Sequence, residues 1–359
     1  MGLGYLVGAK KLEVICEVGV MTRAIWITWE HQRRSIELAK ALDIPCHVLT
    51  FRGPYFVRGL VLAVKTMFLL SSIRPEIVFV QNPSMLGAAI VCLLRRLLGY
   101  KVVVDRHTNF RFESLNSMNP KLMGYHWLSK YTIRSADLTV VTNAYLKQVV
   151  ELWGGRGFVL QDKLPDFSGS RVDMLKGKYN AVFICSYAAD EPIQEVVSAA
   201  KLIDPEICVY ITGNYKKSKK SLVQEIPNNV ILTGFLSEPD FQALIRSVDF
   251  ALALTTMEYT LLCGAYEAVA ADKPLIISDR EALKAYFCGG AIVTENDRKS
   301  IADAIVCAVM NLDALRDEIV GLKGRLQADW HVKFQDLRQT VGLGLENCAN
   351  TCVSSCTME

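Results

Sequence analysis

The sequence predicts an α/β protein with two successive Rossmann-like domains, each a doubly wound parallel sheet, that face a central cleft. Three observations support this. Strand-like runs alternate with helical patterns along most of the chain, which is typical of a parallel sheet covered on both faces. The alternation stops at a polar segment, residues 164–178, and then starts afresh. The 359 residues, 51% hydrophobic and 21% charged, suffice for two buried cores.

The elements follow in order along the chain. In the first half, strands are expected at 24–28, 46–50, 77–80, 101–105 and 138–142, and helices at 33–42, 56–71, 85–98, 121–134 and 144–153. In the second half, strands are expected at 181–186, 207–212, 229–234, 250–254, 274–278 and 291–294, and helices at 193–202, 240–247, 264–271 and from 298 onward. These patterns predict five parts: an extension (1–20), a first domain (21–170), a second domain (176–330), a helix crossing back to the first domain (331–345) and a cysteine-containing tail (346–359).

Charge differs between the two halves. Residues 1–175 hold 22 Lys and Arg against 13 Asp and Glu, whereas residues 176–359 hold 18 against 24. The first half is therefore expected to meet an anionic partner: a lipid surface, a pyrophosphate or a nucleic acid. Nucleic acid is the least favoured, because no zinc finger, helix-turn-helix or RNA-binding aromatic pattern occurs. The most apolar stretches, 56–72 and 85–98, contain cations, which argues against a membrane span, and residues 1–20 fit neither a span nor a signal peptide.

The cysteines favour a reducing compartment. Most of the eleven lie in or beside apolar runs without paired short spacings, which indicates reduced cytosolic thiols. Cys348, Cys352 and Cys356 recur every fourth residue, but no fourth ligand accompanies them, so a tail is favoured over a metal site. A dinucleotide fingerprint, a phosphate-binding P-loop and a DxD-type carboxylate pair are all missing from the sequence. No cofactor and no metal are expected.

One segment of the second half carries a candidate anion site. Gly264 and Ala265 open a predicted helix after a strand end, and the free N–H groups of such a helix start suit a diphosphate. Glu267 follows in what is expected to be the first turn, where its carboxylate could accept hydrogen bonds from a ribose diol. The alternative is that Glu267 only complements the helix dipole.

This region resembles the retaining GT-B glycosyltransferases of family 4. The resemblance is carried by Glu267, Ala268, Pro274, Ile276 and Asp279 within 258–279, and it extends to 232–254 and to 211–214. It implies a GT-B fold, a catalytic Glu258, and a nucleotide-sugar as substrate. Eight residues separate Glu258 from Glu267, where the family has seven. The donor-binding residues that it implies are Gly213, Asn214, Gly234, Phe235, Leu262, Cys263, Gly264 and Glu267.

A second resemblance leaves the stereochemistry open. Family 4 enzymes usually carry an Arg and a Lys after the first strand of the second domain, but residues 185–191 contain no cation. This segment, together with 81–94 and 102–109, is similar to the β-mannosyltransferases that act on dolichol-linked chitobiose, which are inverting GT-B enzymes. Another cation would then have to neutralise the phosphates of the donor. The candidates are Lys216, in a basic run that also includes Lys217, Lys219 and Lys220, and Arg280. A solvated loop explains the lysine run equally well.

Polar residues also end strands of the first half. Asp105 and His107 follow a buried strand, and either could be the general base of an inverting enzyme. In a retaining enzyme, the resemblance implies that His107 binds the hydroxyls of the donor sugar. A histidine that only satisfies a backbone carbonyl is the plain alternative. The residues expected to bind acceptor lie between the first strand and helix: Glu30, His31, Arg33 and Arg34. The two arginines could clamp a pyrophosphate, or could be an ordinary surface pair.

The helix at 56–71 alternates bulky apolar residues with Arg58 and Lys65. This pattern indicates a helix that lies against an anionic membrane leaflet or, alternatively, one that packs against the core with its cations reaching solvent. We therefore expect a cytoplasmic enzyme, peripheral on the inner face of a membrane. It would move sugar from a UDP- or GDP-linked donor to a polyprenyl-pyrophosphate-linked glycan in surface polysaccharide assembly. A non-catalytic GT-B subunit of a membrane complex and a sugar-nucleotide epimerase are the alternatives.

Overall fold

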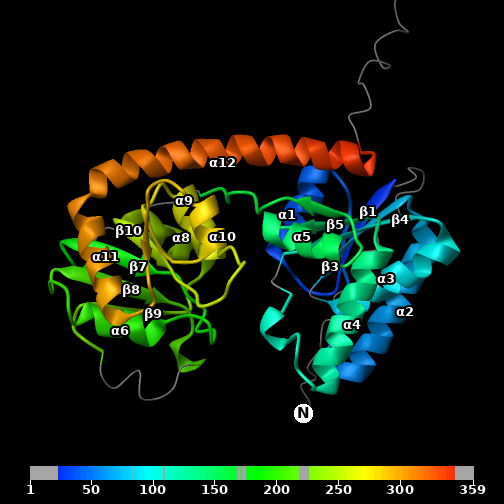
Figure 1. Cartoon of the computed structure of the whole chain (residues 1–359), viewed down its shortest axis with the longest axis horizontal. Helices are drawn as coiled ribbons and strands as arrows, with labels where there is room; N and C mark the ends of the chain where they lie inside the picture. Colours follow the sequence, from blue (N-terminus) through cyan, green and yellow to red (C-terminus); the bar gives the residue numbers. More distant parts are fainter. Residues whose placement is uncertain are drawn as a thin grey trace, which may run out of the picture.

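The computed structural model describes residues 23–82, 84–107, 110–167, 171, 175–217 and 226–343. Within these residues the strands form two six-stranded parallel sheets, each in its own lobe, and one long helix runs across both lobes (Figure 1). This is the two-domain GT-B architecture that the sequence predicts. The expectations for residues 1–20, for the lysines beyond 217 and for the tail from 346 lie outside the described residues.

The first sheet has the strand order β2-β1-β3-β4-β5-β6. Its strands are β1 (Ala24–Thr28), β2 (Cys46–Val48), β3 (Ile77–Asn82), β4 (Lys101–Arg106), β5 (Leu138–Val141) and β6 (Gly157–Val159). Its helices are α1 (Arg33–Leu42), α2 (Tyr55–Ile73), α3 (Met85–Leu98), α4 (Pro120–Ser135) and α5 (Ala144–Leu152). All six residues of β3 are buried, because helices cover both faces of the sheet.

The second sheet has the order β12-β11-β10-β7-β8-β9, which is the Rossmann strand order. Its strands are β7 (Tyr179–Phe183), β8 (Ile207–Thr212), β9 (Val230–Gly234), β10 (Phe250–Ala253), β11 (Leu275–Ser278) and β12 (Ala291–Thr294). The helices are α6 (Ile193–Ala200), α8 (Glu238–Ser247), α9 (Cys263–Ala270), α10 (Glu281–Tyr286), α11 (Arg298–Met310) and α12 (Leu312–Val341). The order of the strands reverses between β7 and β10, and ligands of such sheets bind at the carboxyl ends of the strands beside that point.

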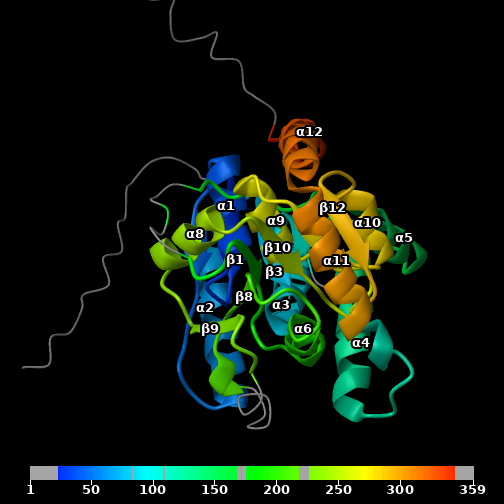
Figure 2. The same ribbon diagram turned by 90° about the vertical axis from the view of Figure 1, so that its left-hand side faces the viewer.

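Helix α12 belongs to the cores of both domains. Leu322 and Leu326 pack into the core of the second domain beside α9, whereas Phe334, Leu337 and Val341 complete the core on the α1 side of the first sheet. The helix starts at Leu312 and is therefore longer than the crossing helix expected from residue 331. Figure 2 shows it lying above both sheets.

Three short-range details differ from the sequence expectations. β6 and α10 were not expected, because each is short and lacks a clear periodic pattern. The helix α9 begins at Cys263, which puts Glu267 in its second turn instead of its first.

Helices α2, α3 and α4 form a layer on the outer side of the first domain, with α3 packed between the other two (Figure 1). α2 is long and apolar enough to cross a membrane by length and composition, although Arg58 and Lys65 lie within it. Yet its two ends connect β2 and β3, two parallel strands of one sheet that lie on either side of β1, through short loops, so the helix lies along that sheet. It therefore has the place of a crossover helix, with much of its surface exposed.

Candidate active site between the two domains

A cavity of about 340 Å³ lies between the two domains. It is lined from the first domain by residues of α1 and of the strand ends, and from the second domain by α9; the lining includes Arg33, Arg34, His107, Asp162, Cys263, Tyr266, Glu267 and Trp330. The structure thus brings together residues that the sequence assigned separately to the donor, the acceptor and the chemistry.

Glu267 is the most perturbed acid of this cavity. Only 16% of its side chain is exposed, and burial raises the pKa of its carboxyl from 4.5 to about 7, against the opposing effect of the Arg33 guanidinium. Arg33 reaches it from the first domain, with 3.6 Å between Nη1 and Oε1, and also bonds Glu37 on its own helix. Arg33 Nη1 also lies 3.9 Å from Oε1 of Glu238 on α8, so two ion pairs span the cleft at the predicted donor site.

The start of α9 is shaped for close approach. Leu262 is the N-cap residue, and no side chain caps the helix among the described residues. A Cβ on Gly264 would lie 2.8 Å from Cγ2 of Ile184, so only glycine lets the helix start pack on the loop after β7. Backbone N–H groups at such an end suit an anion.

Two glycines meet beside this helix. Gly213 and Gly234 end β8 and β9 with positive φ values of 93° and 73°, and the Gly213 N–H donates to the Gly234 carbonyl at 3.1 Å. A Cβ on Gly213 would lie 2.4 Å from the Cys185 carbonyl oxygen. Phe235 follows with 86% of its surface exposed, which leaves an aromatic face free for stacking.

Asn214 and Lys216 lie just beyond these glycines. The Asn214 side chain accepts a hydrogen bond from the Lys216 N–H at 3.2 Å, and Lys216 is exposed. The structure describes no contact between Lys216 and the cavity at Glu267, whose lining does not include it.

A feature that the sequence did not indicate is the loop after β7. Both carboxylate oxygens of Glu191 accept hydrogen bonds from the Ser186 N–H at 3.0 Å, and one also accepts from Ala188 N–H at 2.7 Å. Tyr187 between them has a left-handed φ of 62°, which turns the amides inward. The loop that lacks the family's cations thus binds a carboxylate of its own chain.

Asp105 does not have the surroundings of a general base. It is 1% exposed and accepts hydrogen bonds from Nε and Nη2 of Arg34, at 2.9–3.1 Å. The Arg34 guanidinium is the main factor that outweighs burial and holds the pKa of this carboxyl at about 2. An acid with such a pKa has little tendency to take up a proton near neutral pH.

The same pair changes the expectation for Arg34. Its side chain is 6% exposed, and it also bonds Asp162 and the Leu160 carbonyl. These partners occupy its donors, so Arg34 holds the sheet end together and is not free to clamp a pyrophosphate. Arg33, which is 45% exposed, remains available.

His107 lies next to Asp105, with 3.4 Å between Nδ1 and Oδ2, and it lines the cavity opposite α9. Asp105 can therefore orient the ring, as a carboxylate does for a catalytic histidine. The other first-domain candidates lie further out: Glu30 and His31 are exposed, and Glu30 is 3.6 Å from Arg58 of α2.

Glu258 and Arg280 form an ion pair with each other, 3.0 Å between Oε1 and Nη1. The neighbouring Tyr259 stacks on Tyr145 of the first domain with 3.6 Å between ring centroids, and its carbonyl accepts from Asn143 Nδ2 at 2.9 Å. This loop is therefore a contact between the two domains. Among the described residues, no group of three or more His, Cys, Asp or Glu could hold a metal ion.

The comparisons with known proteins agree with this geometry. Residues 178–311 match the model of the family described as "Glycosyl transferases group 1". HepE from Anabaena, solved in complex with UDP-glucose, has a TM-score of 0.69 at 12% identity, covering 89% of this chain and 99% of its own. Sucrose-phosphate synthase from Thermosynechococcus elongatus has a TM-score of 0.72 at 15% identity, covering 89% and 98%.

A putative UDP-N-acetylglucosamine 2-epimerase from Listeria monocytogenes shares the fold at a TM-score of 0.58 and 12% identity, covering 88% of this chain and 95% of its own. No curated protein sequence matches the chain. The second domain is thus a group 1 glycosyltransferase domain within a complete GT-B fold. The match places residues 178–311 among the group 1 glycosyltransferase domains, and the solved structures show that the chain has the GT-B fold.

Proposed function

We propose that the enzyme transfers a sugar from a UDP-linked donor to a polyprenyl-pyrophosphate-linked glycan. The observation that carries the donor part is Glu267, which is nearly buried beside the uncapped start of α9 within the matched domain. In this proposal the diphosphate binds the N–H groups at Cys263 and Gly264, and the Glu267 carboxylate accepts hydrogen bonds from the ribose diol. The exposed ring of Phe235 stacks on the base. The solved relatives in complex with UDP or UDP-glucose support the choice of nucleotide.

Arg33 supplies the missing cation of this site. When the donor binds, Arg33 pairs with the negatively charged diphosphate instead of with Glu267. The Glu267 carboxylate can then accept hydrogen bonds from the ribose. His107, oriented by Asp105, faces the same cavity and takes the acceptor hydroxyl's proton if the reaction inverts. The anomeric configuration of the product distinguishes an inverting from a retaining reaction.

The acceptor part of the proposal rests on the outer layer of the first domain. Apolar side chains with at least 57% exposure stand on α2, α3 and α4: Tyr55, Phe56, Leu60, Phe68, Leu93, Leu97, Met123 and Trp127. We call them the apolar face. Exposed cations accompany them, including Arg96, Lys121 and Lys130, while Arg58 and Lys65 flank the face on α2. Apolar side chains ringed by cations suit an anionic lipid surface, where a polyprenyl carrier resides.

In this proposal the enzyme is peripheral on the cytoplasmic side of a membrane and serves surface polysaccharide assembly. The described cysteines support a reducing compartment, because all seven are free thiols.

The donor site is tested by thermal shift of the purified protein with UDP, GDP, dTDP, ADP and CMP, with and without EDTA. A nucleotide at a hundredfold excess over its Kd stabilises the protein by about 2.7 kcal/mol. We expect UDP to stabilise it, with or without EDTA, and Glu267→Ala to abolish the shift. The matched control is Asp303→Ala on α11, an exposed carboxylate that should leave the shift unchanged. If none of these nucleotides raises the melting temperature, the protein is a non-catalytic GT-B subunit instead.

Transfer is then measured with UDP-glucose and a synthetic polyprenyl-pyrophosphate oligosaccharide. Product that forms only when acceptor is present supports the proposal. Turnover of the free UDP-sugar without any acceptor contradicts it and identifies an epimerase, whose fold the chain shares.

Membrane binding is tested by flotation with liposomes that contain anionic lipid. We expect Phe56→Ser with Phe68→Ser to abolish binding, and Phe235→Ser, an equally exposed phenylalanine of the second domain, to have no effect. Arg58→Glu with Lys65→Glu should weaken binding at least about tenfold, because each cation near an anionic leaflet contributes about 1 kcal/mol. The pair Arg298→Glu and Lys299→Glu on α11 is the charge control. If the Phe56/Phe68 variant and the Arg58/Lys65 variant both bind liposomes as the parent does, the proposed membrane binding is wrong, while the proposed donor site is unaffected.

A further inference from the structure

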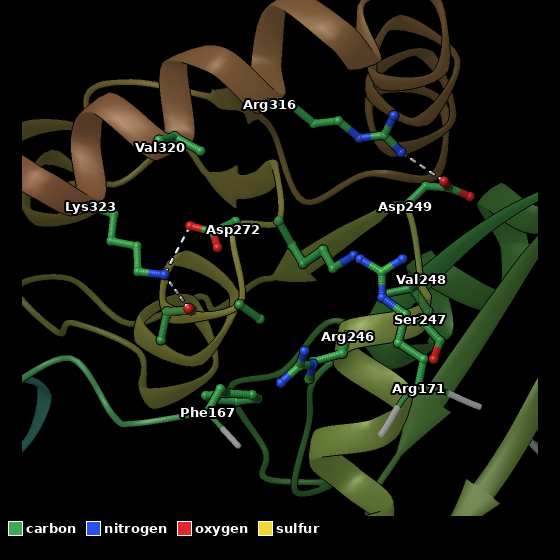
Figure 3. Close-up of a pocket in the computed structure, with 13 residues that line it drawn as sticks. Phe167, Arg171, Arg246, Ser247, Val248, Asp249, Asp272, Arg316, Val320 and Lys323 are labelled. Atoms are coloured by element: carbon green, nitrogen blue, oxygen red, sulfur yellow. Dashed lines mark hydrogen bonds and ion pairs between the residues drawn. The ribbon is translucent and has the colours of Figure 1, made fainter. Parts of the chain in front are cut away.

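A second cavity, of about 610 Å³, lies on the second domain away from the cleft. Four segments wall it: the connection between the domains with Phe167 and Arg171, the end of α8 with Arg246, the turn after α9 with Lys273, and the first half of α12. Figure 3 shows α12 along the top of this cavity, carrying Arg316, Val320 and Lys323. None of its lining residues belongs to the cavity at Glu267.

The cavity holds more positive than negative charge. Its charged side chains are Arg171, Arg246, Lys273, Arg316, Lys323, Asp249 and Asp272. Two cations are paired, Arg316 with Asp249 at 2.9 Å and Lys323 with Asp272 at 2.9 Å, as the dashed lines in Figure 3 mark. Lys323 Nζ also donates to the Ala270 carbonyl at the end of α9.

The other three cations have no counterion. The side chains of Arg171, Arg246 and Lys273 make no ion pair or hydrogen bond in the part of the chain that the structure describes. Lys273 is only 9% exposed, and its side chain lines the cavity without an ion pair or a hydrogen bond among the described residues. Burial, reinforced by the positive charge of Arg171, lowers the pKa of Lys273 to about 8. A bound anion would supply the missing counterion.

The position of the cavity separates it from the donor site. Asp249 lies directly before β10 and Lys273 lies two residues before β11, at the amino ends of these strands, whereas the cleft lies at the carboxyl ends. Its walls also include both segments that run between the domains: the connection after β6 and helix α12. A ligand bound there would contact both at once.

From this arrangement we propose that the cavity binds a small phosphorylated metabolite, whose phosphate group is held by Arg171, Arg246 and Lys273. Three unpaired cations exceed what a single carboxylate needs and match a phosphate of charge near −2. The volume leaves room for an organic part, which Phe167, Val248 and Val320 would contact. The site is independent of the proposed donor and acceptor.

The first test is titration calorimetry of the full chain with pyrophosphate, inorganic phosphate and a hexose phosphate, each in the presence and absence of saturating UDP. We expect one equivalent of pyrophosphate or of the hexose phosphate to bind whether or not UDP is present. Lys273→Gln and Arg246→Gln should each weaken this binding about tenfold or more, because each removes one charge-assisted contact. Arg298→Gln, an exposed arginine of α11, is the matched control and should bind as the parent does.

Arg246 is only partly buried, so Arg246→Gln should fold normally. This variant therefore tests the proposal even if Lys273→Gln folds poorly. Absence of binding by all three probes at millimolar concentration overturns the proposal. So does binding that UDP displaces, which would belong to the cleft, or binding that both variants leave unchanged. Because UDP is used only as a competitor, these outcomes are distinct from a failure of the donor test.

Discussion

The two domains have the same layered sheet and differ in what covers their outer helices. In the second domain α6 and α11 pack against each other over one face of the sheet, and both contribute side chains to its core. In the first domain α2 has only three buried residues, and Phe56 and Leu97 are 87% and 80% exposed. The first half of the chain also carries the excess of cations. A parallel sheet needs one helical layer on each face, so a further apolar surface on such a layer is available to a partner.

The cleft shows the same contrast on a smaller scale. Asp105 is buried and Glu267 is nearly buried, but Asp105 has an arginine bonded to both oxygens, whereas Glu267 has Arg33 at 3.6 Å. The pKa of the first is lowered to about 2 and that of the second is raised to about 7. The surroundings of a carboxylate therefore separate a structural ion pair from a group available to a ligand.

The largest expected effect comes from the ion pair of the first domain. Asp105→Ala leaves the Arg34 guanidinium buried without its main counterion and should cost about 3–5 kcal/mol of unfolding free energy. Urea denaturation measures this, with Arg23→Gln as the control, because the Arg23–Glu76 pair is largely exposed and should contribute less than about 1 kcal/mol. A variant with full stability but no activity would show that Asp105 acts in the chemistry after all.

Helix α12 allows a matched comparison of the two cores. Leu337→Ala and Leu322→Ala remove the same side chain from the first and the second core, and each should cost about 3 kcal/mol, within the usual range for buried leucine. Leu337→Ala should in addition make the connection between the domains more sensitive to limited proteolysis. If Leu337→Ala leaves the free energy of unfolding unchanged, α12 is not anchored in the first domain.

The next effect is pH-dependent and comes from Glu267. Because its folded pKa of about 7 lies above the ordinary 4.5, its contribution to stability is complete below about pH 4.5 and is lost as the pH rises through 7. Glu267→Gln removes that loss, so at pH 8 the variant should be more stable than the parent by about 3 kcal/mol, because the pKa is raised by about 2.5 and each pKa unit corresponds to about 1.36 kcal/mol. At pH 4.5 the two should be equal. Denaturant curves at both pH values measure this, and equal stability at pH 8 would contradict a buried Glu267.

The smallest effect is expected on the apolar face. Phe56→Ser should change the free energy of unfolding by no more than about 0.5 kcal/mol, because the ring is already in water. A loss of several kcal/mol in denaturant melts would mean that the ring is buried in solution, against another copy or against the chain itself.

Much of the fold could be predicted from the sequence, because long buried strands such as β3 and β8 are unbroken apolar runs followed by helical patterns. Short elements such as β6 and α10 gave no comparable signal, since three to six residues define no period. Glu267 could be found because its motif is local. The Arg34–Asp105 pair could not, because its partners are 71 residues apart, and the Glu191 loop depends on a left-handed Tyr187 that no residue pattern indicates.

The course of α12 also bears on how the chain folds as it is synthesised. The core of the first domain includes Phe334, Leu337 and Val341, which leave the ribosome after every strand of both sheets. The second domain has all its own strands and the first part of α12 before that point. The domain made first therefore completes its core last, so premature termination before residue 334 would leave a finished second domain attached to a first domain with an incomplete core.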